Sequence, residues 1–261
     1  MEPSVTFIMA ARDAAHTVRQ SVISALAQEY NGVVKLIAVD DGSNDATLEI
    51  LHEFDNIMVL THSASMGRAA SRNLALEQVA TEFVAIQDAD DVSLPNRLRS
   101  SVRALQSADA TVVGTQLSWT DPRTGPYRGA VWPLEHPAAE KLLIAGRMPI
   151  AHPSMMARTD ALCSVGGYSD KYPVAEDLDL CLRIRGRNSS ARFVSAASSE
   201  VIYRRRRVAK LSYTVESAHW RNVVLDDNGL DRKRSRRSDP YVGSALQWGR
   251  QGLKALLRAN D

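Results

Sequence analysis

The segment AIQDADDVSLP, residues 85–95, brings three carboxylates together, because Asp88, Asp90 and Asp91 fall within four positions. Like charges this close repel one another, so the segment predicts a compensating cation nearby. Carboxylate oxygens suit Mg²⁺ or Mn²⁺, and Mg²⁺ is commonly held by one or two carboxylates together with phosphate oxygens of a substrate. The alternative is that these aspartates are solvated and cap the helix that begins near Leu94.

Two further segments carry groups that suit a phosphate-bearing ligand. The segment VDDGSNDAT places Asp40 and Asp41 before a glycine turn, and the segment GRAASRN begins a helix with Arg68 and Arg72 on one face. Arginine side chains in that arrangement can bind phosphate oxygens. The alternatives are a polar loop for the first segment and two solvated surface arginines for the second.

A fourth segment, AEDLDL, places an acidic pair later in the chain. Glu176 and Asp177 stand at the start of a predicted helix, with Asp179 two positions beyond. The dipole of a helix by itself favours carboxylates in its first turn, which is the alternative to a functional role for this pair.

The first half of the chain alternates strands and helices. Apolar runs predict strands over residues 5–10, 33–40, 57–60, 83–87 and 111–119, and helical spacing predicts helices over 17–28, 45–54, 66–79 and 94–108. This alternation implies right-handed βαβ units and a largely parallel sheet. Ligands of such sheets bind beyond the carboxyl ends of the strands. Both aspartate clusters lie at those ends, so we expect them to line one crevice.

The second half is less regular and ends in a basic segment. Helices are predicted over residues 136–147, 159–165 and 175–186, and a strand over 199–205. Residues 231–239 form a charged linker, and residues 240–261 have helical spacing with an apolar stripe and a basic row. Such a helix suits the surface of an anionic membrane. The alternative, which we favour slightly, is that the stripe packs on the rest of the protein.

Composition fits one α/β domain with an appendage. The chain has 261 residues, of which 44% are hydrophobic, and a net charge of +2. Residues 1–200 carry 18 basic and 24 acidic side chains, a net −6, whereas residues 201–261 carry 14 and 6, a net +8. This asymmetry predicts a polyanionic surface nearby. No apolar run reaches the roughly 18 residues that span a bilayer, and we see no signal peptide.

The two cysteines, Cys163 and Cys181, lack the spacing of a metal site. We expect both to be small buried hydrophobic residues in a reduced, cytosolic compartment, with a disulfide as the open alternative.

Taken together, the DDGS turn, the GRAASRN helix, the QDADD cluster followed by LPNRL, and the ED pair resemble family 2 glycosyltransferases of the GT-A fold. The resemblance covers roughly residues 3–205. It implies an α/β, Rossmann-like single domain with a mainly parallel central sheet, over residues 1–207, and a basic helical extension over residues 208–261. The nucleotide-binding half would span about residues 1–119 and the acceptor half about 120–207.

The resemblance also implies residue roles for a nucleotide diphosphate-sugar donor and for Mn²⁺ or Mg²⁺. Asp41 matches the residue that binds the base, Asp90 the principal metal ligand, and Asp88 a position near both ribose and metal. Arg72 matches the arginine near the diphosphate. The remaining nucleotide-binding positions would be Ala10, Arg12, Asp40, Arg68 and Ala89.

The family transfers the sugar to an acceptor hydroxyl with inversion at the anomeric carbon. Asp177 matches its catalytic base, and the neighbouring charges of Glu176 and Asp179 would raise the pKa of Asp177 towards neutrality. The segment AHPSMMAR resembles the acceptor side, so His152, with Asp179, is expected to bind a carbohydrate or lipid-linked acceptor. A buried, hydrogen-bonded histidine is an equally good interpretation of His152.

Three features depart from the family pattern. One is that no run of the sequence is long and apolar enough to span a membrane, although many relatives act on lipid-linked acceptors. Arg12 stands where relatives often have an aromatic residue that packs on the base, and YRRRR stands where many have a histidine. Polysaccharide, cell-envelope or glycolipid synthesis would place the chain in the cytoplasm, with a peripheral contact at the inner face of the membrane through its basic tail.

Two other functions remain as alternatives, and the first of them uses the same aspartates. The segment DADDV fits the nucleophile motif of haloacid-dehalogenase-type phosphatases, with Asp88 attacking phosphorus, but that motif usually follows the first strand and here follows the fourth. A basic nucleic-acid-binding protein is the other alternative, because RKRSRR can contact phosphates. No base-reading module accompanies it, so we do not expect nucleic acid as a partner.

Overall fold

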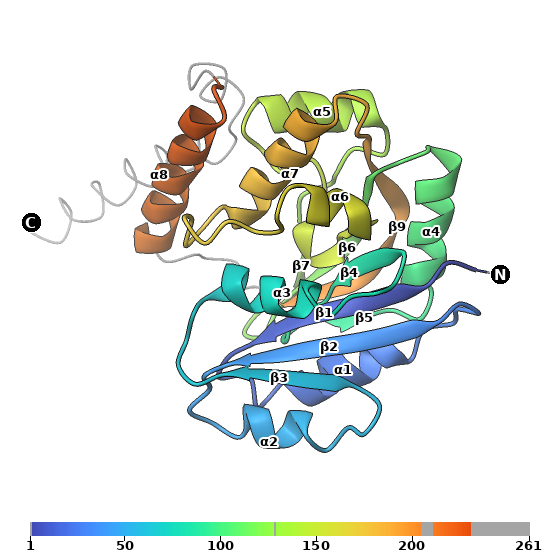
Figure 1. Cartoon of the computed structure of the whole chain (residues 1–261), viewed down its shortest axis with the longest axis vertical. Helices are drawn as coiled ribbons and strands as arrows, with labels where there is room; N and C mark the ends of the chain where they lie inside the picture. Colours follow the sequence, from blue (N-terminus) through green and yellow to red (C-terminus); the bar gives the residue numbers. More distant parts are fainter. Residues whose placement is uncertain (1, 128, 205–210, 231–261) are drawn as a thin grey trace, which may run out of the picture.

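The computed structural model describes residues 2–127, 129–204 and 211–230, and those residues form one sheet covered by helices on both faces (Figure 1). The strands are β1 (Val5–Ala11), β2 (Val34–Asp41), β3 (Met58–His62), β4 (Phe83–Ile86), β5 (Val92–Ser93), β6 (Val112–Asp121), β7 (Gly125–Tyr127), β8 (Met156–Arg158) and β9 (Phe193–Arg204). The helices are α1 (Val18–Leu26), α2 (Thr47–Leu51), α3 (Arg68–Leu76), α4 (Arg97–Ser107), α5 (His136–Ile144), α6 (Thr159–Ser164), α7 (Glu176–Arg187) and α8 (Leu211–Asp227). A 3₁₀ turn, η1, spans His152–Ser154.

The first half of the chain has the predicted βαβ organisation. Strands β3, β2, β1 and β4 lie side by side in that order, and each neighbouring pair is parallel. The register places Ala11 of β1 beside Asp40 of β2, so these strands end at the same edge of the sheet. That edge is where the sequence predicts the crevice.

The second half of the sheet is mixed rather than parallel. Strand β8 pairs antiparallel with both β4 and β6, β9 runs parallel to β6, and β5 pairs antiparallel with β9. The parallel pairing that we expected therefore holds for the first four strands and for β6 with β9, whereas β5, β7 and β8 pair antiparallel. Strand β8 has only three residues and β5 only two, too few for an apolar pattern to reveal.

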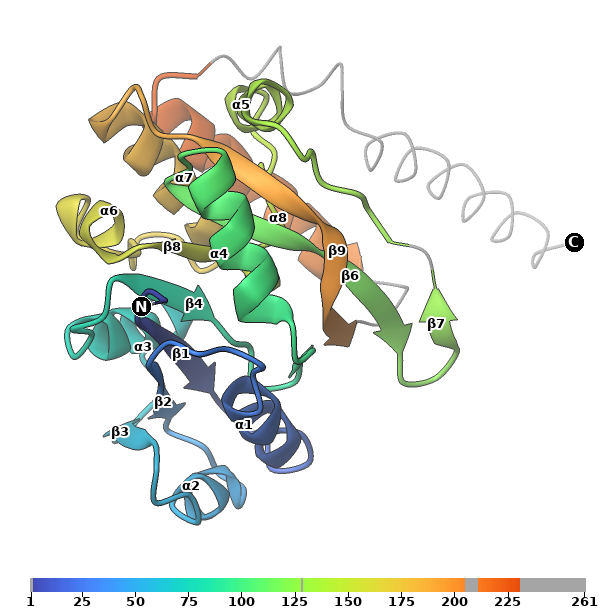
Figure 2. The same ribbon diagram turned by 90° about the vertical axis from the view of Figure 1, so that its right-hand side faces the viewer.

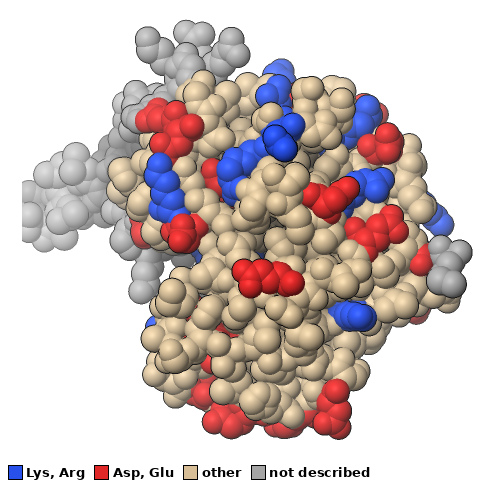
Figure 3. Space-filling model, in the orientation of Figure 1, with Lys and Arg blue, Asp and Glu red and all other residues tan. Residues whose placement is uncertain are grey.

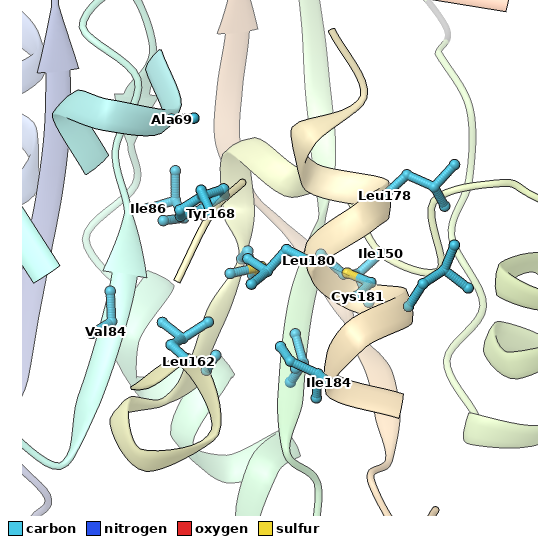
Figure 4. Packing of buried hydrophobic residues seen from close by; sticks show 14 of the residues in the cluster. Ala69, Val84, Ile86, Ile150, Leu162, Tyr168, Leu178, Leu180, Cys181 and Ile184 are labelled. Carbon is cyan, nitrogen blue, oxygen red and sulfur yellow. The ribbon is translucent and has the colours of Figure 1, made fainter. Parts of the chain in front are cut away.

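Both faces of the sheet are buried, because successive residues of the inner strands alternate between two hydrophobic clusters. In β1, Phe7 packs with α1 and α4, whereas Ile8 packs with α3, α6 and α7. Figure 2 shows α4 on one face of the sheet and α7 and α8 on the other. In Figure 4, Leu180 and Ile184 of α7 lie in the same cluster as residues of β4. Strands buried on both faces produce the continuous apolar runs seen in the sequence.

Helix α8 belongs to the packed body of the domain. Its residues Val224 and Leu225 are fully buried and join the core cluster of α7. Gly146 follows α5 with a φ of +71°, and a Cβ atom at that position would lie 2.6 Å from Leu225. Packing therefore continues past residue 207, where we expected the extension to begin, and reaches the end of the described chain at residue 230.

Truncation of Leu225 to alanine should lower the free energy of unfolding by about 2–5 kcal/mol, because it leaves a cavity between α8 and the core. Chemical denaturation of both proteins measures this. Exposed Val215, on the same helix, provides the control, since Val215→Ala should change stability by less than about 0.5 kcal/mol. Equal effects would contradict the packing of α8.

Within the described residues, no helix is long and apolar enough to cross a membrane. The predicted linker and tail helix, residues 231–261, lie outside the described residues. Both cysteines are free. Cys181 is buried as expected, but Cys163 is exposed, so the expectation of two buried cysteines is wrong for Cys163.

Candidate active site

A pocket of about 660 Å³ opens beyond the carboxyl ends of β1, β2 and β4. Segments far apart in the sequence meet there, and nine of the predicted site residues line it: Ala10, Arg12, Asp41, Arg68, Arg72, Asp88, Ala89, Asp90 and Glu176. The other four predicted residues, Asp40, His152, Asp177 and Asp179, are not among the residues that line it.

Asp41 stands at the end of β2 and organises one wall of the pocket. Its carboxylate accepts hydrogen bonds from the Ser65 hydroxyl at 2.7 Å and from the backbone amides of Met66 and Gly67 at 2.8 and 3.0 Å. Burial raises the pKa of Asp41, but these hydrogen bonds outweigh it, so the pKa lies below its ordinary value. Asp41 is thus ionised and fixes the turn that begins α3.

Asp40 has a different environment. It is 3% exposed, and its Oδ2 accepts a hydrogen bond from the backbone amide of Ser43 at 3.1 Å. Arg12 lies at the pocket, where its guanidinium donates to the Ser65 hydroxyl at 2.6 Å. Asp40 therefore shapes the DDGS turn, whereas Arg12 and Asp41 present side chains at the pocket wall.

The three aspartates after β4 differ in exposure. Asp88 is partly exposed and accepts a hydrogen bond from Arg72, while Asp90 is exposed at the pocket. Desolvation and the charge of Asp88 both raise the pKa of Asp90. Asp91 is buried, and its Oδ1 accepts the backbone amide of Arg204 at 3.0 Å. Burial, followed by the charges of Asp88 and Asp90, raises the pKa of Asp91 to about 9.

Arg72 connects the two acidic clusters of the pocket. Its guanidinium is buried, with Nη2 3.1 Å from Asp88 and Nη1 3.0 Å from Glu176, and it lies 5.4 Å from the ring centroid of Tyr168. Arg68, one turn earlier on α3, is half exposed and lies 3.5 Å from Glu176. Arg68 is thus the more accessible arginine. Arg72 is buried and links the loop after β4 to α7 through its two ion pairs.

Asp177 is the second residue of α7 and follows Glu176. Ala175, the residue before the helix, has a φ of +72°, which turns the chain sharply into the helix. The Asp177 carboxylate accepts the backbone amide of Leu178 at 2.8 Å. Burial, with the charge of Glu176 as the next cause, raises the pKa of Asp177 to about 6. A carboxylate with that pKa is ionised near neutral pH and still accepts a proton readily.

The two residues expected on the acceptor side have structural partners instead. His152 is 7% exposed, its Nε2 lies 3.0 Å from the Tyr168 hydroxyl, and burial and Arg72 lower its pKa to about 3. Asp179 is 2% exposed and forms an ion pair with Arg183 at 2.7 Å. His152 thus fits the second interpretation given above, a buried, hydrogen-bonded histidine, and Asp179 pairs with Arg183. Acceptor binding by either residue stays a prediction.

The family profile described as "Glycosyl transferase family 2" matches residues 6–164, more than half of the chain. The chain belongs to glycosyl transferase family 2. This membership confirms the resemblance drawn from the four motifs and identifies the chain as a glycosyltransferase.

Individual relatives agree with the family. EpsE of Bacillus subtilis (strain 168) is 29% identical over 229 residues, which cover 83% of this chain and 80% of EpsE. Escherichia coli WfgD, named as a UDP-Glc:alpha-D-GlcNAc-diphosphoundecaprenol beta-1,3-glucosyltransferase, is 33% identical over 38% of this chain and 39% of its own. The chain thus spans most of EpsE but well under half of WfgD.

Solved structures share the fold. S. aureus TarS (1–349) in complex with UDP-GlcNAc aligns with a TM-score of 0.67 at 18% identity, covering 89% of this chain and 69% of the TarS chain. The Pyrobaculum calidifontis mannosyltransferase PcManGT, in complex with GDP-Man and Mn²⁺, aligns with a TM-score of 0.68 at 17% identity, covering 87% of this chain and 64% of its own. The predicted α/β fold of GT-A type is thereby confirmed.

The aspartates of this transferase fit a divalent cation with few protein ligands. Within the described residues, no group of three His, Cys, Asp or Glu side chains could enclose a metal ion. Asp88 and Asp90 are two carboxylates at the same pocket, and desolvation, followed by the charge of Asp88, raises the pKa of Asp90. Mg²⁺ typically takes one or two carboxylates and completes its shell with water and substrate phosphates, so this donor set suits it.

Several residues that shape the pocket were missed by the sequence analysis. Ser65 and Met66 precede α3 and bind Asp41, while Tyr172 and Tyr203 come from the second half of the chain and line the pocket. For Ser65 and Met66 a signal existed, because both directly precede the GRAASRN motif. Tyr203 also had a signal, because it begins the YRRRR segment. For Tyr172 none did, since its position depends on how distant segments pack.

Proposed function

We propose that this transferase moves a hexosyl group from a nucleoside diphosphate-sugar to an acceptor hydroxyl, with inversion and with Mn²⁺ or Mg²⁺ as cofactor. One observation carries the proposal: Asp41, Asp88, Asp90 and Glu176, from segments far apart in the sequence, line one pocket. In that pocket the ionised carboxylate of Asp41 suits a nucleobase, and the carboxylates of Asp88 and Asp90 suit a divalent cation. The half-exposed guanidinium of Arg68 suits a diphosphate.

Each group has a role in the proposed reaction. Asp88 and Asp90 would hold the cation, which supplies Lewis-acid stabilisation for the departing nucleoside diphosphate. Asp177 takes the proton from the acceptor hydroxyl as its oxygen attacks the anomeric carbon on the face opposite the leaving group. Glu176 forms ion pairs with Arg68 and Arg72 and so holds both guanidinium groups in place. Because it is paired, it is less available than Asp177 as a catalytic base.

The relatives support a carbohydrate or lipid-linked acceptor and a role in cell-envelope or polysaccharide synthesis. WfgD is named for a diphosphoundecaprenol-linked acceptor, and ExoO of Rhizobium meliloti, 33% identical over 42% of this chain and 32% of its own, is named for succinoglycan biosynthesis. The proposed peripheral contact with membrane through residues 240–261 rests on the sequence alone.

The alternatives of a phosphatase and of a nucleic-acid-binding protein have less support. Asp88 is held by buried Arg72 rather than presented free as a nucleophile. On the face in Figure 3, basic and acidic side chains are interspersed, and no continuous basic area covers the described part of that face. Nonspecific binding to nucleic acid depends on such an area.

The proposal predicts that UDP or GDP binds at least about 10-fold more tightly with Mn²⁺ than with chelator, a difference of about 1.4 kcal/mol. Asp90→Ala should bind equally weakly in both conditions, because one of the two carboxylates for the cation is gone. Isothermal titration calorimetry measures both affinities.

Asp170→Ala is the matched control, since it removes an exposed carboxylate from the same pocket but from another wall. It should keep the gain from Mn²⁺. A wild-type protein that binds neither UDP nor GDP, or binds them equally with chelator, would overturn the proposed metal-dependent function. Loss of the gain in Asp170→Ala as well would refute the assignment of the metal to Asp90.

A further inference from the structure

A buried polar frame lies directly behind the aspartate loop, residues 88–91. Gln87 and Arg97 are each 1% exposed, so neither can contact a donor or an acceptor directly. Buried side chains of this polarity occur only where hydrogen bonds satisfy them. Here those bonds end on the loop itself, on Ile86 of the preceding strand, and on Ser21, Ser93 and Pro153.

The Gln87 side chain closes the aspartate loop. Its Nε2 donates to the backbone carbonyl of Asp91 at 3.0 Å and to the hydroxyl of Ser21 at 2.8 Å, and it lies 3.3 Å from the carbonyl of Asp88. The Ser21 hydroxyl in turn donates to the carbonyl of Asp88 at 2.7 Å. One amide group therefore fixes both ends of the loop that carries the two proposed metal ligands.

Arg97 orients the Gln87 side chain through a hydrogen bond to its amide oxygen. Its Nη1 donates to Gln87 Oε1 at 3.1 Å and to the Ser93 hydroxyl at 2.8 Å, and its Nη2 donates to the carbonyl of Ile86 and, at 3.2 Å, to that of Pro153. All four acceptors are neutral oxygens. A buried arginine normally pairs with a carboxylate, so this one is unusual.

The charge of Arg97 has carboxylates of the loop as its electrostatic counterparts. Burial lowers the pKa of Arg97 to about 10, and the electrostatic interactions of Arg97 with Asp91 and Asp88 oppose that shift. The guanidinium is therefore charged at neutral pH and lies behind a loop that gathers three aspartates. Together with Arg72 on the pocket side, Arg97 offsets the repulsion expected among the three aspartates of the loop.

We propose that Gln87 and Arg97 are positioning residues of the transferase: Gln87 fixes the spacing of Asp88 and Asp90 by closing their loop, and Arg97 orients Gln87 while placing a buried positive charge behind it. The inference rests on the proposed metal-dependent donor site. Neither residue touches donor, cation or acceptor, and both act through the backbone of the loop.

Gln87→Met tests this, because methionine keeps the length of the side chain and removes its amide. We expect the Mn²⁺-dependent gain in UDP or GDP affinity to fall at least 10-fold, while the affinity with chelator changes less than 2-fold. Backbone amides of residues 88–94 should exchange with deuterium at least 10-fold faster in the metal-free variant, and those of β1 and β2 should be unchanged.

Gln116→Met is the matched control. Gln116 is also a buried glutamine, and its side chain bonds the backbone of Trp132 and Ala196 in the second half of the domain. This variant should lose stability without losing the gain from Mn²⁺. Arg97→Lys keeps the charge but not the four-bond geometry, so we expect it to retain more of the gain than Arg97→Met.

The outcomes separate this inference from the proposed function. If the wild-type protein shows no Mn²⁺-dependent binding, the proposed function fails, and hydrogen exchange of the metal-free protein still decides whether Gln87 positions the loop. Unchanged exchange over residues 88–94 in Gln87→Met, or an equal loss of the gain in Gln116→Met, would overturn the positioning role.

Discussion

Replacing Asp177 with asparagine should lower the rate of sugar transfer by about 10²–10⁴-fold, the usual contribution of a general base. Affinity for UDP or GDP with Mn²⁺ should change little, because Asp177 does not line the pocket in which we place the donor. The measurement is initial-rate kinetics with the nucleotide sugar that the wild-type protein uses, beside calorimetry of nucleotide binding.

The pH dependence of the wild-type rate follows from the same carboxylate. The pKa of Asp177 is raised to about 6 by burial and by Glu176, and a base must be ionised to accept a proton. The value of kcat/KM should therefore rise with pH through an apparent pKa near 6 and level off above it. The residual activity of Asp177→Asn should not show this rise of kcat/KM with pH.

Stability should change in the direction opposite to activity. Because the pKa of Asp177 is higher in the folded than in the unfolded chain, folding favours its protonated form, and that contribution is lost as the pH rises from about 4 to about 6. Above that window, ionised Asp177 costs the folded state on the order of 1–3 kcal/mol. Asp177→Asn should accordingly be more stable than the wild-type protein at neutral pH and no more stable near pH 4.

Glu176→Gln separates Asp177 from its neighbour. It removes the other carboxylate of the pair and should lower the apparent pKa of the rate profile, since the charge of Glu176 helps to raise that of Asp177. If Asp177→Asn turns over normally and Glu176→Gln does not, the base is Glu176.

Sequence reasoning succeeded where a pattern is local. The apolar runs of β1, β2 and β4 are buried on both faces, so burial and sequence agree at nearly every residue. Asp41 is the last residue of β2, and Asp88 and Asp90 come shortly after the end of β4. The carboxyl ends of parallel strands meet at one edge. The alternation of strands and helices thus predicted both the first half of the fold and the convergence of these carboxylates.

It could not decide between interpretations where burial depends on distant segments. His152 lies in the acceptor-like motif and Asp179 in the acidic motif of α7, and Tyr168 and Arg183 bond to them inside the core. No local pattern distinguishes a polar side chain that meets a buried partner from one that meets a ligand. Short strands such as β8 were not predicted from the sequence for a related reason, because their pairing partners lie far away in the sequence.

Arg72 is the residue whose role changed most between sequence and structure, and removing it should produce the largest loss of stability. Arg72→Met leaves the carboxylates of Asp88 and Glu176 without their shared cation. Breaking a buried ion pair in this way typically costs about 3–5 kcal/mol. For a domain of this size that corresponds to a drop in Tm of roughly 10 °C, which differential scanning calorimetry measures directly.

A double-mutant cycle distinguishes the lost charge pair from lost packing. If the cost of Arg72→Met comes mainly from the stranded carboxylate of Glu176, the double variant Arg72→Met/Glu176→Gln should be more stable than Arg72→Met alone. If the cost comes from packing against Tyr168, the second substitution should restore nothing.

Arg183→Met provides the comparison, because it also breaks an ion pair with a buried carboxylate, that of Asp179, but one away from the pocket. Both variants should be destabilised, whereas only Arg72→Met should also weaken the Mn²⁺-dependent binding of UDP or GDP. Arg72 holds Asp88 at the loop and Glu176 at the start of α7 at once, so its loss should disturb the proposed cation site together with the entry to the proposed base. Equal nucleotide affinity in Arg72→Met and Arg183→Met would show that the ion pairs of Arg72 contribute to folding alone.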